Sequence, residues 1–212
     1  MPDKTQKPPA ARPRNRDETR AAILAAAQSL LAQEGFSGFG VNALARCSGF
    51  DKQLIYRYFG GLDGLVDALG ETLAGWVSTH LVPALDQNPG PGYGDLLEAV
   101  LIAYLDALRG DSLMQKLVAW ELSDPSPQVR RLSDQRARAM GELVARLRGE
   151  RQPAPGVDAP ALNAILIAAI QHLVLAGASS GRFTGMALAS DDDWDRAKAM
   201  LSRIIRALHA PS

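Results

Sequence analysis

Apolar residues recur every three or four positions along most of this chain, which is the period of amphipathic helices. Val41, Leu44 and Ala45 form one such stripe, and a second stripe follows a break at Ser48-Gly49. No segment has the strict apolar and polar alternation that predicts a strand. We therefore expect an all-α protein of about nine helices. Three precede residue 62, and the other six cover approximately residues 63–81, 94–109, 111–122, 127–149, 160–180 and 191–209.

Residues 41–65 are typical of a helix-turn-helix. Gly49 can adopt the positive φ that a tight turn needs, and Asp51 can accept hydrogen bonds from the first free N–H groups of the next helix. Phe50, Leu54, Ile55 and Phe59 would face the first helix. The opposite face would carry a set of long polar and aromatic side chains, Lys52, Gln53, Tyr56, Arg57 and Tyr58.

These five outward side chains match the chemistry of DNA. Glutamine can pair with adenine, lysine and arginine can bond guanine or phosphate, and tyrosyl hydroxyls can bond phosphate oxygens. We expect Lys52 and Gln53, with Arg57, to contact bases, and Tyr56 and Tyr58 to contact phosphates. The segment is therefore a candidate for reading the major groove of double-stranded DNA.

At these residues the sequence resembles the TetR family of bacterial one-component regulators. The matching positions are Val41, Leu44-Ala45, Gly49-Phe50-Asp51, Ile55-Tyr56-Arg57-Tyr58-Phe59 and Leu62. Phe50 and Asp51 replace the usual Val and Ser, and they keep the roles of packing and capping. Leu62 replaces a Lys that in the family grips a phosphate at the start of the fourth helix, so that contact is absent here.

The resemblance is specific over residues 17–69 and architectural beyond them. It implies a helix-turn-helix DNA-binding domain at 17–62 and a larger helical domain for ligand binding and dimerisation at 63–212. It also implies a homodimeric regulator, most simply a repressor, that leaves a palindromic operator when an unknown small-molecule effector binds. The alternative is a ligand-binding helical dimer without sequence-specific DNA binding, which the exchange at Leu62 and the zero net charge favour.

Charge is distributed unevenly although the formal net charge is zero. Residues 1–16 contain five basic side chains, four prolines and one acid, and they predict a disordered basic arm rather than a signal peptide. Such an arm can lie along DNA, and its structural alternative is a solvated tail.

The two C-terminal helices predict how the chain assembles. Residues 161–178 are apolar on nearly all sides, so this helix has to be covered on more than one side, and a second subunit would cover it. The last helix carries a stripe of Trp194, Ala197, Leu201, Ile204, Ile205 and Leu208. No segment is expected to provide the ~18 uncharged apolar residues of a membrane span, and we expect a soluble, cytoplasmic protein.

A ligand pocket in the C-terminal domain is poorly defined by sequence. Polar-tipped or large side chains on apolar segments are the candidates, namely Trp76, Tyr104, Met114, Trp120, Glu121 and His172. Each has a structural alternative: the tryptophans can be core anchors, His172 a core or dimer-interface residue, and Glu121 a solvated residue at a helix end.

Enzymatic and metal sites are not indicated. Nucleotide-binding and hydrolase motifs are missing, the three histidines lack metal-ligand spacing, and Asp191 to Asp193 fit the start of a helix. We expect no enzyme activity, no cofactor and no metal. The single cysteine, Cys47, is expected to be a small buried hydrophobe.

Overall fold

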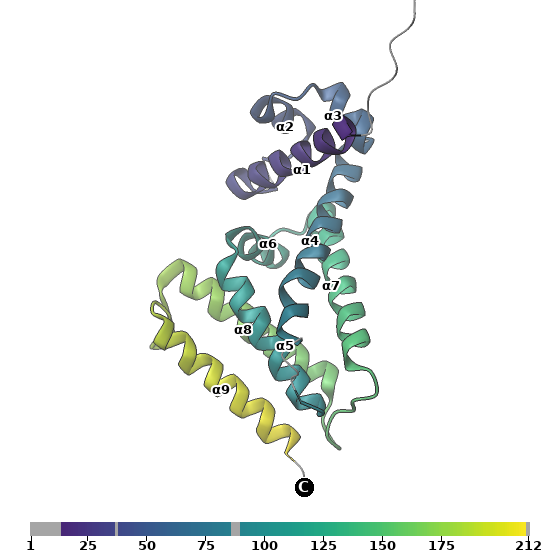
Figure 1. The fold of residues 1–212 in the computed structure, drawn as a ribbon. Coiled ribbons are helices and arrows are strands. Elements are labelled where there is room, and N and C mark those ends of the chain that lie inside the picture. The colour runs from purple at the N-terminus through teal and green to yellow at the C-terminus, as the bar shows by residue number, and fades with distance from the viewer. Residues whose placement is uncertain (1–13, 37, 86–89, 211–212) are drawn as a thin grey trace, which may run out of the picture. The chain divides into compact units, whose positions relative to one another are not determined.

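The computed structural model describes residues 14–36, 38–85 and 90–210, and it forms two compact units, Met1–Leu65 and Val66–Ser212 (Figure 1). The described residues contain nine α-helices and one short hairpin. The prediction of an all-α fold with a three-helix N-terminal part is therefore confirmed.

The first unit holds α1 (Arg14–Glu34), α2 (Val41–Ser48) and α3 (Lys52–Phe59). Helix α2 packs against both α1 and α3. The core side chains are fully or almost fully buried, and they are Ile23, Ala27, Leu30, Leu31, Leu44 and Ile55. Helix α1 begins at Arg14, within the segment 1–16 that we expected to be a disordered arm, so residues 14–16 are helical instead. The rest of the arm, residues 1–13, lies outside the described residues.

The second unit contains most of α4 (Leu62–Leu85) and all of the later helices. These are α5 (Tyr93–Gly110), α6 (Ser112–Ser123), α7 (Pro127–Arg148), α8 (Ala159–Ser180) and α9 (Asp191–His209). Helix α5 is central, because it packs against α6, α8 and α9. Helix α4 continues past the predicted end at residue 81 and includes Pro83. A proline in the last turn removes only one helical hydrogen bond, so it does not force the helix to end earlier.

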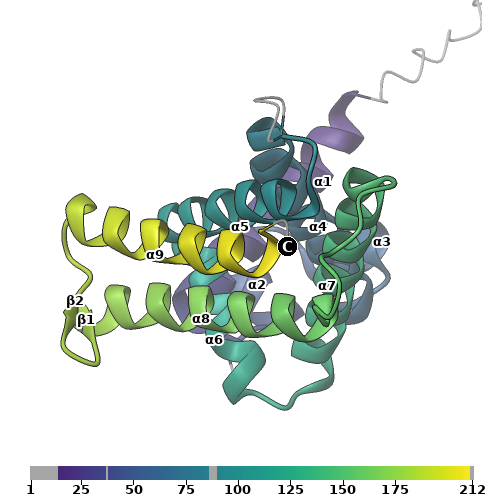
Figure 2. The ribbon, with the colours of Figure 1, turned by 90° about the horizontal axis from the view of Figure 1, so that it is seen from below.

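A short hairpin joins α8 to α9, where the sequence predicted only a loop. It pairs β1 (Arg182–Phe183) with β2 (Met186–Ala187) in antiparallel register. Both turn residues have positive φ, 45° at Thr184 and 83° at Gly185, as two-residue hairpin turns require. Strands of two residues are too short to show an alternating pattern, which explains why the sequence did not predict them. Figure 2 shows α8 and α9 running antiparallel from this hairpin.

Helix α8 contradicts the expectation that no segment could span a membrane. By length and hydropathy it is a candidate span, with a mean hydropathy of 1.8 and 17% of its best window buried in this chain. Leu166, Ile170 and Val174 are its buried residues, and the helix packs on α5 and α6. One such helix is weak evidence for a membrane, because a core helix of a globular protein meets the same test.

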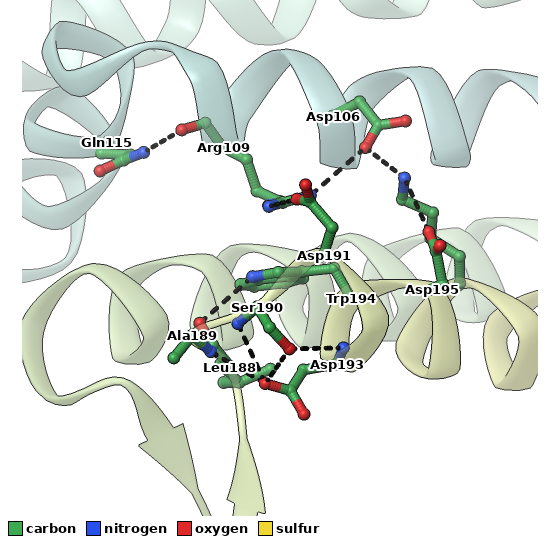
Figure 3. A network of polar contacts seen from close by, with 11 residues as sticks. Asp106, Arg109, Gln115, Leu188, Ala189, Ser190, Asp191, Asp193, Trp194 and Asp195 are labelled. Atoms are coloured by element: carbon green, nitrogen blue, oxygen red, sulfur yellow. Dashed lines mark hydrogen bonds and ion pairs between the residues drawn. The ribbon is translucent and has the colours of Figure 1, made fainter.

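Polar contacts attach the start of α9 to α5 (Figure 3). Arg109 on α5 donates to Asp191 at 3.0 Å, and its guanidinium lies 4.7 Å from the centre of the Trp194 ring. Lys198 forms an ion pair with Asp106 at 2.7 Å. Ser190 and Asp193 form a reciprocal capping box that begins α9. Hydrogen bonds from Ser190 lower the pKa of Asp193.

Candidate nucleic-acid interface and ligand cavity

Local hydrogen bonds fix both ends of α3. Gly49 ends α2 with a φ of 73°, and its N–H donates to the carbonyl of Ala45 at 3.2 Å. Asp51 then accepts a hydrogen bond from the N–H of Gln53 at 2.8 Å, as the capping prediction required. Gly60 closes α3 with a φ of 72°. The sequence between Gly49 and Gly60 therefore defines a short helix of fixed length.

Helix α3 has one buried and one exposed face. Ile55 and Phe59 are buried, whereas Lys52, Gln53 and Arg57 are exposed. Tyr56 is 56% exposed although it is a large aromatic residue.

Tyr58 is half-buried, and the Arg57 guanidinium lies 5.5 Å from the centre of its ring. The structure thus brings four of the five predicted DNA-contacting side chains to the exposed surface of one helix. The fifth, Tyr58, lies at the edge of this surface. Their contacts with DNA remain a prediction.

The turn from α3 to α4 is unusually close. A Cβ atom on Gly64 would lie 1.8 Å from the carbonyl oxygen of Phe59, so only glycine fits there without movement of the backbone. The half-buried Leu62 begins α4, followed by Asp63 in the first turn. The N-terminus of α4 therefore presents no basic side chain at the two positions where it starts.

Cys47 is exposed, which corrects the expectation that it is a buried hydrophobe. Val41 and Leu44 are the buried residues of α2, and Cys47 lies beyond the stripe that they define. The Cys47 thiol bonds the carbonyl of Leu44 at 3.4 Å, an ordinary contact within the helix.

A small cavity of about 50 Å³ lies between α5, α7 and α8. Seven aliphatic or methionine side chains line it, and they are Leu96, Leu97, Val100, Leu101, Met140, Val144 and Ile167. The remaining lining residues are Tyr93, Tyr104 and Asn163, and no lining residue carries a charge. Such an enclosure favours an apolar ligand, which would have to widen the cavity on binding.

Only one of the six predicted ligand residues, Tyr104, lines this cavity. Trp76 donates from Nε1 to Asp111 at 2.8 Å and packs edge-on against Tyr104, so it joins α4 to the start of α6. Met114 is fully buried, and Trp120 is half-buried on the same helix. His172 is exposed and contacts the ring of Phe183.

Glu121 belongs to a nearly buried ion pair rather than to a solvated helix end. Its carboxylate accepts two hydrogen bonds from Arg136 of α7, and the two side chains are 14% and 13% exposed. Burial by itself would lower the pKa of Arg136, but the hydrogen bonds and charge of Glu121 raise it overall. Burial raises the pKa of Tyr104, whose hydroxyl accepts a hydrogen bond from Gln171 at 2.9 Å. Glu121 and Arg136 are therefore already paired with each other.

The polar end of the cavity was not predicted from the sequence. Asn163 donates from Nδ2 to the hydroxyl oxygen of Tyr93 at 3.2 Å, across 70 positions of sequence. The one available signal was that Asn163 interrupts an apolar helix, but nothing in the sequence indicated that Tyr93 would lie beside it.

Four of the exposed large apolar side chains of the second unit lie on α8 and α9, and the others are Leu122 of α6 and Phe183 of β1. Ile165 of α8 is 65% exposed, and Met200, Ile204 and Leu208 are exposed at four-residue spacing on α9. The stripe predicted on α9 is therefore divided between two faces. Trp194, Leu201 and Ile205 are its buried residues.

Clusters of three or more potential metal ligands do not occur among the residues that the structure describes. Two of the three aspartates at the start of α9 have other roles, Asp191 in the ion pair and Asp193 in the capping box described above.

The described residues thus form a helical protein with an N-terminal helix-turn-helix and a larger C-terminal unit. Residues 23–69 match the family model of the bacterial regulatory proteins of the tetR family. This match identifies residues 23–69 as the DNA-binding region of the TetR family, as the resemblance predicted.

Solved structures share the fold over nearly the whole chain. A TetR family transcription regulator from Marinobacter aquaeolei VT8 is 21% identical, with a TM-score of 0.59 and coverage of 90% of this chain and 97% of that one. FadR from Bacillus subtilis in complex with stearoyl-CoA is 16% identical, with a TM-score of 0.61 and coverage of 90% and 97%. The multidrug binding protein EbrR complexed with imidazole is 18% identical, with a TM-score of 0.61 and coverage of 95% and 96%. No curated protein matches the sequence.

Proposed function

We propose that this regulator is a cytoplasmic homodimeric repressor that binds a palindromic operator through α3 and releases it when a small molecule enters the cavity. The observation that carries the proposal is the exposed face of α3. Its polar side chains stand on a helix that Ile55 and Phe59 anchor, and none of Lys52, Gln53 and Arg57 is buried. An exposed face of this composition suits base edges and phosphates.

The proposed dimer forms through α8 and α9. Ile165, Met200, Ile204 and Leu208 would be removed from water by a second copy. Arg109, Asp191 and Trp194 already hold the start of α9 in place on α5, so this surface would need little rearrangement to pair. Two-fold symmetry would then present two α3 helices to two half-sites, which is the reason for a palindromic operator.

The proposed effector enters the apolar cavity, and two proteins of the same fold were solved in complex with a small molecule. FadR was solved with stearoyl-CoA and EbrR with imidazole. In the present chain the cavity holds about 50 Å³, so a larger ligand would favour a state with separated helices. Release of DNA requires that the ligand bind one state of the protein more tightly than the other.

Helix α7 provides a route from the cavity to α4. Met140 lines the cavity, and two residues on the same helix contact Asp67 of α4. Gln135 donates to Asp67 at 3.1 Å, and Arg131 forms an ion pair with it at 3.0 Å. The two helices approach closely here, since a Cβ atom on Gly70 would overlap the Gln135 side chain. In the proposed mechanism, movement of α7 changes α4, whose first residues belong to the DNA-binding unit.

A salt series on the full chain tests whether the protein binds DNA through phosphate contacts. Binding to a random-sequence duplex should be detectable at low salt and should weaken steeply as salt rises, with a slope of about 0.9 per neutralised phosphate. The alternative function, a ligand-binding dimer without DNA recognition, predicts no complex even at the lowest salt. The alternative is motivated by Leu62, which stands at the start of α4 where the family usually has a phosphate-binding lysine.

A further inference from the structure

The cavity contains one buried hydrogen-bond acceptor without a donor. Asn163 uses its Nδ2 atom to bond Tyr93, whereas its Oδ1 atom is buried and has no hydrogen-bond partner among the described residues. Buried polar atoms are rarely left in this condition, because desolvation without a compensating hydrogen bond is unfavourable. An unpaired atom that borders a cavity is therefore a candidate contact for a ligand.

Tyr93 adds a donor beside this acceptor. Its ring is buried and stacks on His209, with 5.4 Å between ring centres and 29° between planes. The Tyr93 oxygen accepts the hydrogen bond from Asn163, so its own O–H remains available to donate. Asn163 and Tyr93 thus offer one acceptor and one donor at the same end of the cavity.

The other lining residues determine which chemical groups the rest of the ligand can carry. Tyr104 lies eleven residues from Tyr93 on α5, which places the two about 16 Å apart along the helix axis. Between them the lining is aliphatic, and the Tyr104 hydroxyl is bonded to Gln171, which does not line the cavity. An ionised ligand group would lie among uncharged side chains here, at a large desolvation cost.

We propose that the effector is a neutral, elongated, largely hydrocarbon molecule whose hydroxyl group bonds Asn163 Oδ1 and the Tyr93 hydroxyl. A hydroxyl group both donates and accepts, so it satisfies the two protein groups at once. This inference rests on the proposed function, because it specifies the ligand of the cavity to which that function assigns the effector.

The test uses two isomeric probes, 1-nonanol and methyl octyl ether, titrated calorimetrically into the full chain. The two molecules have the same atoms and nearly the same volume, but only the alcohol can donate a hydrogen bond. We expect the alcohol to bind at least about tenfold more tightly, because the ether leaves Asn163 Oδ1 unpaired. In Asn163→Leu this preference should disappear through loss of alcohol binding, with ether binding retained. Tyr93→Phe should keep part of the preference, because Asn163 remains.

The thermal midpoint of Asn163→Leu shows whether the variant is folded, and it should equal or exceed that of the unaltered chain. Equal affinity for the two probes, or binding of neither probe, would overturn the inference. So would an unchanged preference in folded Asn163→Leu. DNA binding in the salt series is measured without any probe, so a failure of the regulator proposal is visible separately from a failure of the ligand assignment.

Discussion

On α3, the groups that position the exposed face come from the immediate sequence. Gly49 ends the preceding helix, Asp51 bonds the backbone two residues later, and Gly60 ends α3. In the cavity, by contrast, Tyr93 and Asn163 bond each other across 70 positions. A DNA-reading face can therefore be fixed by short-range rules, whereas a ligand site depends on how distant helices pack.

The largest expected effect tests whether the two units have separate cores. Leu44 is fully buried in the first unit, and Leu44→Ala should reduce the free energy of unfolding by about 2–5 kcal/mol. All three tryptophans lie in the second unit. Circular dichroism should therefore show early loss of helix while tryptophan emission is unchanged.

Leu108→Ala is the matched control in the second unit, where Leu108 is also fully buried. It should shift the tryptophan transition to lower temperature. Coincident loss of helix and tryptophan signal in Leu44→Ala would contradict separate cores.

The next effect concerns the dimer that the regulatory unit is proposed to form. Ile204→Asp places a charge in the exposed apolar stripe of α9, and light scattering should report a monomer. Ala199→Asp is the control, because Ala199 is exposed on another side of the same helix. If Ile204→Asp stays dimeric at micromolar concentration, this surface is not the interface.

A smaller effect is expected at the base-reading face. Gln53→Ala should reduce binding to the preferred operator by about 10- to 100-fold and leave binding to random DNA nearly unchanged. Tyr56→Phe removes only a hydroxyl and should weaken both kinds of DNA to a similar extent. Fluorescence anisotropy on the two duplexes measures each ratio. An equal loss on both for Gln53→Ala would assign Gln53 to phosphate.

A single substitution at the contact between α7 and α4 should change the effect of ligand on DNA affinity by only a few-fold. Gln135→Leu removes the hydrogen bond to Asp67. DNA affinity without ligand should stay within about twofold, whereas the loss of DNA affinity caused by ligand should shrink by about fivefold. Gln128→Leu, the same exchange earlier on α7, is the control. Undiminished release in Gln135→Leu would exclude this route.

The smallest effect is an acid dependence within the second unit. A hydrogen bond from Arg206 lowers the pKa of Glu98, so the pair stabilises the fold above the carboxyl's ordinary pKa. This stabilisation is lost as pH falls through the lowered pKa. Glu98→Gln should therefore lower the thermal midpoint by about 1–3 °C at pH 7, with the difference vanishing near pH 3. Arg206→Gln should reproduce the effect, and a difference that persists at pH 3 would rule out the pair as its cause.

The local features of the DNA-binding unit could be predicted because their signals lie within a few residues. Asp51 was expected to cap α3 and does so, and Gly49 has the predicted positive φ. Arg14 shows the limit of this approach, because α1 starts there although the acidic residue of its first turn is Asp17.

The cavity and the surface of α9 could not be predicted from the sequence for a physical reason. Apolar periodicity identifies a helix face but not its partner, so Ile204 and Ile205 were placed on one stripe although one is exposed and the other buried. The partner of Glu121 was likewise invisible, since Arg136 lies on the next helix and reaches Glu121 only after α6 and α7 pack.

The most direct measurement is selection of bound duplexes from a random DNA pool with the full chain at moderate salt, accompanied by light scattering of the free protein. A two-fold symmetric motif with half-sites about one helical turn apart, together with a dimeric mass, is the predicted result. A dimer that enriches no sequence would contradict the proposal and favour a ligand-binding dimer without sequence-specific DNA recognition.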